Sequence, residues 1–198
     1  MNKNLHIYKI KSSFLLLKFF IFVFGKSLQR IKYDLSNSTS PEFWIHPAIL
    51  TPVILLFRDL SITKMTSLID FSLQDYIGKK FRFIAFYIFV SYNYNVRLYF
   101  FSQIKLTYPL LSLTSIFKSA GWLEREVLDM FGVYFLGNNF MVRILTDYGF
   151  KGFPLRKDFP LTGFEEIYYD DSEKRIIYDV VELMQEYRTF KLNLSIPA

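Results

Sequence analysis

Two long apolar runs, separated by a short polar break, dominate the middle of the chain. Residues 81–91 are almost continuously Phe, Ile, Tyr and Val, and residues 96–104 form the second run. Such runs of aromatic and β-branched residues favour β-strands, and the first is continuous enough to be covered on both faces. Because Tyr92–Asn95 is short and polar, we expect it to turn the chain so that the two strands pair.

Shorter strands and a helix are predicted before these runs. Phe43–Ile45 is expected as a short strand that ends before Pro47, and Ser67–Asp70 is a candidate for a further strand. Between them, residues 48–59 carry apolar side chains at helical spacing, which predicts a helix with Pro52 in its first turns, where a missing N–H is tolerated. These apolar positions are Ile49, Val53, Leu56 and Phe57.

A second amphipathic helix is predicted after Pro109. Ser119 is suited to cap its N-terminus, and the helix is expected to run to Phe131 and to end at Gly132. A shorter helix is expected just before it, over residues 112–118. The apolar face of the second helix would consist of Leu123, Val127, Met130 and Phe131. Its charged residues are expected to cover the rest of its surface: Glu124, Arg125, Glu126 and Asp129.

The chain from residue 145 to residue 163 is predicted to be an extended loop, because glycines and prolines interrupt it repeatedly. Loops of this length in a compact domain are uncommon and are usually functional or disordered. This one is rich in aromatic residues and paired charges, which disfavours disorder, so we expect it to wrap over another protein. A hairpin is expected after it, with residues 165–169 turning at Asp170–Ser172 into residues 174–178.

These elements predict an α+β fold, with a small, mostly antiparallel sheet and packed helices, followed by a long extended C-terminal segment and hairpin. The polar run at residues 36–41 is expected to be a linker. We therefore divide the chain into a basic N-terminal extension with its linker (1–42), an α+β domain (43–132) and an extended segment that wraps a partner (133–198).

The positive charge of the chain lies in the N-terminal extension. The formal net charge is +6, and residues 1–40 contribute all of it, with seven Lys or Arg against Asp34 alone. This distribution argues against a basic face that binds nucleic acid. The extension also holds the apolar run Phe14–Phe24, interrupted by Lys18 and shorter than the roughly 20 residues that a transmembrane helix needs. We expect a short helix packed against this protein or a neighbour, and no transmembrane helix.

Composition limits the chemistry further. The sequence contains no cysteine, so it offers no disulfide and no thiolate for an iron–sulfur cluster or a zinc site. Aromatic residues make up 20% of the chain, which we interpret as the codon bias of an AT-rich genome, such as that of an organelle. No dinucleotide, phosphate-loop, serine-hydrolase or zinc-protease motif occurs. Glu126 and Asp129 could share a helix face as metal ligands, but Arg125 is better placed to pair with Asp129.

The most specific signal is a set of three sequence blocks between Gly121 and Arg188. They read GWLEREVLDMFGV, RILTDYGFKGFPLRKDFPLTG and KRIIYDVVELMQEYR. They closely resemble the signature regions of the 30-kDa subunit of proton-pumping NADH:ubiquinone oxidoreductase (complex I), the NADH dehydrogenase subunit 9 family, in its mitochondrial form. Looser resemblance extends over about residues 43–190. The stretch 138–143 departs from it, because Asn138 and Val142 stand where the family usually has a histidine and the first of two arginines.

The resemblance implies a structural and assembly subunit in the hydrophilic arm of complex I, which supports electron transfer from NADH to ubiquinone without an active site or cofactor of its own. It implies other complex I subunits as partners, above all those that house the quinone site and the terminal iron–sulfur cluster, and no nucleic acid. FMN and the clusters would lie in other subunits. It also implies a place on the matrix side of the mitochondrial inner membrane, peripheral to the bilayer.

The charged residues of these blocks are the candidate site residues, with no catalytic, cofactor-binding or metal-binding residue among them. We expect them to anchor the long loop or to form ion pairs at the subunit interface. They are Glu124, Arg125, Glu126, Asp129, Arg143, Asp147, Arg156, Lys157 and Asp158. We expect replacement of Arg156 by Ala to lower the amount of assembled complex.

Two other classes of function are compatible with parts of the sequence. The basic tail and the many aromatic residues would suit an organellar ribosomal or RNA-binding protein, although the neutral remainder of the chain disfavours it. A subunit of a relative of complex I, such as a membrane-bound hydrogenase or a plastid-type dehydrogenase, would have a similar role with a different electron donor. The residue sequence of the block after Arg143 argues against that alternative.

Overall fold

The computed structural model describes residues 28–32 and 42–188. The chain divides into two compact units, Met1–Asp158 and Phe159–Ala198, and each is described by itself. The predicted linker at 36–41 and the predicted helix at Phe14–Phe24 lie outside the described residues.

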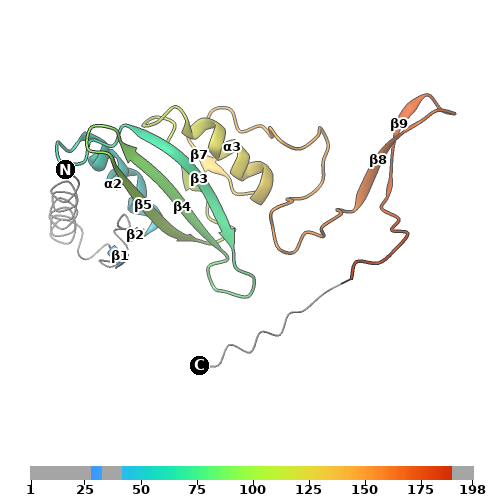
Figure 1. The fold of residues 1–198 in the computed structure, drawn as a ribbon, viewed down its shortest axis with the longest axis horizontal. Coiled ribbons are helices and arrows are strands. Elements are labelled where there is room, and N and C mark those ends of the chain that lie inside the picture. Colours follow the sequence, from blue (N-terminus) through green and yellow to red (C-terminus); the bar gives the residue numbers. More distant parts are fainter. Residues whose placement is uncertain (1–27, 33–41, 189–198) are drawn as a thin grey trace, which may run out of the picture. The chain divides into compact units, whose positions relative to one another are not determined.

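The first unit is built on a five-stranded mixed sheet with the strand order β1-β2-β5-β4-β3 (Figure 1). β2 (Glu42–Ile45) pairs antiparallel with β1 (Leu28–Lys32) and parallel with β5 (Val96–Ile104). β4 (Phe83–Ser91) pairs antiparallel with both β5 and β3 (Ser67–Asp75). The predicted hairpin is therefore confirmed as β4 and β5. β1 lies within the segment that the sequence assigned to the N-terminal extension.

Helix α2 (Pro47–Asp59) follows β2 directly and confirms the predicted helix. His46 begins it, because its Nδ1 accepts a hydrogen bond from the Ala48 amide at 3.3 Å, and Pro47 takes a first-turn position where no N–H is needed. The buried face is shifted from the predicted one. It consists of Leu50, Val53, Ile54 and Phe57, while the predicted Ile49 and Leu56 are only partly buried.

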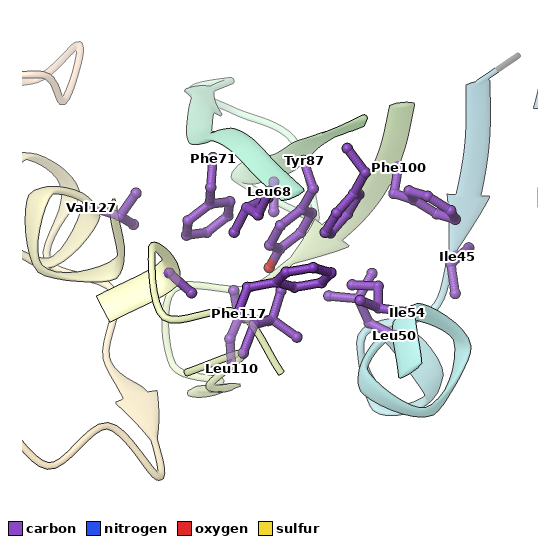
Figure 2. Packing of buried hydrophobic residues seen from close by; sticks show 14 of the residues in the cluster. Ile45, Leu50, Ile54, Leu68, Phe71, Tyr87, Phe100, Leu110, Phe117 and Val127 are labelled. Atoms are coloured by element: carbon purple, nitrogen blue, oxygen red, sulfur yellow. The ribbon is translucent and has the colours of Figure 1, made fainter. Parts of the chain in front are cut away.

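One apolar core lies between the sheet and the two described helices, as Figure 2 shows. Alternate residues of β2, β4 and β5, and several of β3, point into it. Some of their rings stack closely, and the centroids of Phe71 and Tyr87 are 4.2 Å apart. Residues 81–91 were predicted to be covered on both faces, but among the described residues only the inner face of this strand is fully buried. On the outer face, Ile84, Phe86 and Ile88 are only half-buried. Figure 2 labels core residues from the sheet, from α2 and from the segments after β5: Leu68, Phe71, Tyr87, Phe100, Leu50, Ile54, Leu110, Phe117 and Val127.

Helix α3 (Ala120–Phe131) packs against β3 and ends at Gly132, whose φ of 72° is left-handed, as predicted. Two details were wrong. Ser119 makes no capping bond, because its hydroxyl donates instead to the Leu68 carbonyl at 3.1 Å. Residues 112–118 form turns and not a helix, and the Glu124 carboxylate accepts hydrogen bonds from the Ser112 hydroxyl and the Leu113 amide at the start of this stretch.

Short strands flank α3 on either side. β6 (Leu110–Leu111) pairs in parallel with β7 (Phe135–Leu136), a contact that the sequence did not predict. The pairing joins the segment after α3 to the segment after β5 and sets the start of the following loop. The sequence grouped residues 133–158 with the C-terminal segment, whereas the first compact unit extends to Asp158.

The second unit contains the hairpin of β8 (Glu165–Asp170) and β9 (Arg175–Val180), close to the expected positions. Its strands are exposed along almost their whole length. The Asp170 carboxylate accepts hydrogen bonds from the Ser172 amide and hydroxyl, which shapes the turn.

Candidate functional site

Asp129 of α3 holds the start of the long loop. Its side chain has 0% exposure, and its carboxylate accepts hydrogen bonds from the amides of three successive loop residues at 2.7–3.2 Å. The Thr146 hydroxyl donates a further bond of 2.5 Å, and Arg143 lies 3.7 Å away as an ion pair. The amide donors belong to Ile144, Leu145 and Thr146. One carboxylate therefore fixes the backbone of an otherwise irregular segment.

The charge of Asp129 is stabilised by these donors. Burial alone would raise the pKa of the carboxyl, but the hydrogen bonds from Thr146, Leu145 and Ile144 outweigh it, so that the pKa is lowered. The sequence placed Asp129 on the charged surface of the helix, paired with Arg125. That placement was wrong, because the loop covers the carboxylate and supplies its partners.

Glu124 is the second buried carboxylate of α3, with 2% exposure. It accepts hydrogen bonds from the Ser112 hydroxyl and the Leu113 amide, both at 2.7 Å, and from the Asn138 amide nitrogen at 3.0 Å. Its expected place on the exposed surface was also wrong. Burial raises its pKa, and the three neutral donors only partly oppose this effect. Asn138, one of the two departures from the family pattern, thus helps tie the chain after β7 to α3.

The end of the loop is held by an ion-pair cluster at the end of β3. The Arg82 guanidinium binds Asp75 through two bonds of 2.8 and 2.9 Å and Asp158 at 2.8 Å. The backbone amide of Lys157 donates to the same Asp75 carboxylate at 2.9 Å. Arg82 holds the pKa of Asp75 and of Asp158 below the ordinary value. Asp75 and Arg82 were missed as site residues, although both lie within the region of looser resemblance, residues 43–190.

Arg156 and Gly132 bring the loop against the C-terminal end of α3. The Arg156 Nε donates to the Phe131 carbonyl at 2.6 Å, and its guanidinium lies 4.1 Å from the centre of the Phe153 ring. Burial and the nearby Arg82 lower the pKa of Arg156. A Cβ on Gly132 would lie 2.5 Å from both Arg156 and Phe153. Glycine is therefore required here both by its backbone and by the packed loop.

The other predicted site residues lie at the surface. Arg125 donates to the Val142 carbonyl at 2.9 Å and lies over the Trp122 ring at 5.0 Å. Glu126 and Asp147 are exposed, as is the side chain of Lys157. The loop and α3 also expose large apolar groups, with Trp122 66% and Phe140 75% accessible. Aromatic and arginine side chains at a surface are typical of protein–protein interfaces.

The hairpin of the second unit has one mainly apolar face and one face that mixes charged and apolar residues. Because strand side chains alternate, the pairings Ile167 with Tyr178 and Tyr169 with Ile176 bring their apolar groups to the same face. Each of these four side chains is about half exposed or more. The opposite face carries the apolar pair Tyr168 and Ile177 between charged residues, which are Glu166, Asp170, Arg175 and Asp179. Within the second unit as described, this apolar face is open.

In residues 28–32 and 42–188, no set of three or more His, Asp or Glu side chains is placed to hold a metal ion. The same residues contain no helix long and apolar enough to span a bilayer. What the described site can do chemically is to fix a loop and present a surface.

Residues 43–165 match the family described as the 30 Kd subunit of respiratory-chain NADH dehydrogenase. The chain is 43% identical over 162 residues to NADH-ubiquinone oxidoreductase subunit 9 of Prototheca wickerhamii, covering 82% of this chain and 84% of the relative. It is 39% identical over 153 residues to a Candida albicans protein named NADH dehydrogenase (ubiquinone) iron-sulfur protein 3, mitochondrial, covering 77% and 55%. The solved trypsin-resistant fragment (1-134) of Nqo5 has the same fold, with a TM-score of 0.52 and 20% identity over 62% of this chain and 96% of that chain.

The matched region contains the sheet from β2 onward, both described helices and the anchored loop. The relative from Prototheca wickerhamii is aligned over most of its length as well as most of this chain. The chain belongs to the 30-kDa subunit family of the respiratory-chain NADH dehydrogenase.

Proposed function

We propose that this chain is a structural and assembly subunit of the hydrophilic arm of complex I, with no active site of its own. The observation that carries the proposal is the hairpin of β8 and β9, whose apolar face is open in a chain of this family. An isolated two-stranded hairpin is at best marginally stable in water. Packing of this face on another subunit would remove its apolar side chains from water and stabilise both surfaces.

The anchored loop supports the same role. Asp129 and the Arg82 cluster fix its two ends on the first unit, so that its exposed aromatic groups are presented in a defined position. A surface that is ordered before binding loses less conformational entropy when the partner docks. The loop is thus suited to a permanent interface, with partners proposed to be the subunits that house the quinone site and the terminal iron–sulfur cluster.

The absence of a cofactor on this chain is part of the proposal. The Candida albicans relative carries "iron-sulfur protein" in its name. Iron–sulfur clusters in proteins are held mainly by cysteine thiolates, and this sequence contains none. FMN and the clusters are therefore proposed to lie in other subunits. The proposed location is the matrix side of the mitochondrial inner membrane, as the name of the same relative supports in part.

The first test is native purification from mitochondrial membranes in mild detergent, with the chain followed by mass spectrometry beside in-gel NADH oxidation. We expect it to migrate with a large NADH-oxidising assembly and to remain there after a high-salt wash. Migration with ribosomal particles would instead support the RNA-binding alternative. An association that resists the high-salt wash would tell against that alternative, because contacts with phosphate weaken steeply as the salt concentration rises. Recovery as a free monomer would contradict the subunit proposal.

The interface is tested by replacing Tyr169 and Ile176 together with Ser on the apolar face of the hairpin. We expect the amount of assembled complex to fall severalfold on native gels, because two large buried contacts are lost, each worth about 1.5–3 kcal/mol. The matched control is the pair Glu166→Gln and Asp179→Asn, which also face each other across the strands but on the opposite face. Equal assembly of both double variants would count against this face as an interface.

A further inference from the structure

Basic side chains gather at one end of the main sheet in the first unit. The register places Asp75, Phe83 and Ile104 side by side where β3 ends, β4 begins and β5 ends. The loop of residues 76–82 connects β3 to β4 at this end (Figure 1), residues 105–109 follow β5, and the end of the anchored loop is bound to Asp75. Four lysines of these segments form what we call the basic end: Lys79, Lys80, Lys105 and Lys157.

Aromatic rings hold three of these ammonium groups in defined positions. The Nζ atoms of Lys79 and Lys157 lie 4.6 and 5.7 Å from the centre of the same Tyr76 ring. The Nζ atom of Lys105 lies 5.9 Å from the centre of the Phe81 ring, a contact that joins the two loops. Attraction between a cation and an aromatic face offsets part of the repulsion between neighbouring ammonium groups. The ring contacts therefore keep together positive charges that would otherwise spread apart.

The carboxylates at this end of the sheet do not neutralise the lysines. Asp75 and Asp158 both pair with Arg82. Among the described residues, none of the four lysines of the basic end forms an ion pair with a carboxylate. With Arg82 and Arg156 included, the three segments carry six cations against two carboxylates, a net charge of +4. Such an excess creates a local field that attracts an anionic partner.

Large apolar side chains are exposed among these lysines. Ile77, Leu106 and Tyr108 are all exposed, and they belong to the same two loops as Lys79 and Lys105. Apolar groups rimmed by charged residues mark surfaces that other proteins cover, and complementary charge selects the partner. A partner that fits both features presents carboxylates together with apolar side chains.

We propose that the basic end binds an acidic segment of a neighbouring subunit, one that carries several Asp or Glu residues together with apolar side chains. The proposal rests on the subunit role proposed above, because the partner is another chain of the same complex. Ammonium groups held on rings suit separate carboxylates, since each carboxylate can bind one ammonium group without a change in its position. The partner's apolar side chains would cover the exposed groups of the two loops.

A partner rich in phosphate fits the basic end less well. The Asp158 side chain is exposed beside Arg82, and the closely spaced phosphates of a lipid surface or a nucleic acid would repel its charge. A peptide segment can place its carboxylates away from Asp158. Binding to single-stranded nucleic acid also uses aromatic rings that are free to stack on bases, whereas two ammonium groups already lie against the Tyr76 ring.

The direct test treats the purified complex with a water-soluble carbodiimide, which joins an ammonium group to a carboxylate only where the two are in contact. Mass spectrometry identifies the links, and we expect Lys79, Lys80 or Lys105 to be joined to Asp or Glu residues of another chain. Lys64 is the matched control, because it is exposed at the opposite end of β3, and it should give severalfold fewer links. An equal yield from Lys64, or no link from the basic end in a complex that contains the chain, would overturn this proposal and leave the subunit role standing.

A second measurement reverses the charge with Lys79→Glu and Lys105→Glu together. We expect the amount of assembled complex on native gels to fall severalfold. Two control pairs should assemble normally: Lys79→Arg with Lys105→Arg, which keeps the charge, and Lys64→Glu with Lys118→Glu, which reverses it at other exposed positions. Normal assembly of the charge-reversed chain would overturn the proposal. So would binding of the full-length chain to RNA or to vesicles of anionic phospholipid, if charge reversal abolishes that binding and the carbodiimide gives no link to another protein.

Discussion

The two buried carboxylates of α3, those of Asp129 and Glu124, have different surroundings. Asp129 is surrounded by backbone N–H groups and an arginine, whereas Glu124 has three neutral donors. Their pKa values are accordingly shifted in opposite directions, downward for Asp129 and upward for Glu124. The stability of the protein should therefore depend on pH in opposite ways through these two side chains.

We expect Asp129→Asn to lower the free energy of unfolding by about 2–3 kcal/mol at pH 7, because the amide cannot replace a charged acceptor of several hydrogen bonds. Since the pKa of Asp129 is lowered in the folded state, its contribution is present above the unfolded value of about 3.9 and is lost as the pH falls through the folded value. Urea denaturation at pH 7 and in steps below pH 4 measures both effects. A variant as stable and as acid-sensitive as the parent chain would refute the anchoring role.

For Glu124 the sign is reversed. Its pKa is raised above the ordinary value of 4.5, so the folded state binds the proton more tightly, and the stability of the protein falls as the pH rises from 4.5 through the folded value. Gln cannot ionise, and its carbonyl can still accept from the Leu113 amide. In denaturant titrations, we expect the free energy of unfolding to fall less between pH 4.5 and pH 7.5 in Glu124→Gln than in the parent chain. An identical pH dependence of the two proteins would show that Glu124 titrates normally.

Secondary-structure elements were predictable where local pattern and packing agree. The β4–β5 hairpin, α2 and the end of α3 at Gly132 follow from apolar runs, helical spacing and a left-handed glycine. The prediction that Glu124 and Asp129 lie on the exposed surface of α3 was wrong. A charged side chain on the polar side of a helix faces solvent only when no other segment covers it. Residues 112–113 and Asn138 cover Glu124, and the loop at residues 144–146 covers Asp129. Helical periodicity holds no information about segments that reach the helix from elsewhere in the chain.

At the end of α3, Gly132→Ala separates backbone strain from packing. A left-handed φ costs any non-glycine residue about 1 kcal/mol, and the new Cβ would also collide with Phe153 and Arg156. Gly78→Ala is the matched control, because its φ of 84° imposes similar strain with nothing within 4 Å of the Cβ. We expect Gly132→Ala to lower the melting temperature clearly more than Gly78→Ala does. Equal shifts in melting temperature would mean that the loop moves away from the new Cβ without any loss of stability.

At the scale of the whole molecule, Arg156 links α3, the loop and the proposed interface. Arg156→Ala removes the bond to Phe131 and the stacking on Phe153, so we expect about 1–3 kcal/mol less stability together with less assembled complex on native gels. Arg97→Ala, a change of the same kind at an exposed position of β5, is the control and should leave both unchanged. Normal assembly and NADH oxidation in Arg156→Ala would argue that the loop anchor is dispensable.

By itself, the sequence determined the α+β class, the principal hairpin, both described helices and the family, because each rests on local periodicity or on ordered blocks of residues. The pairing of β2 with β5 in parallel, the union of β6 with β7 and the partners of Asp129 and Asp75 were decided only by the tertiary structure. These contacts join residues far apart in the chain, and no local pattern encodes which backbone amide will meet a given carboxylate. The Asp129 carboxylate becomes buried and gains these hydrogen bonds only when the loop is in its folded position.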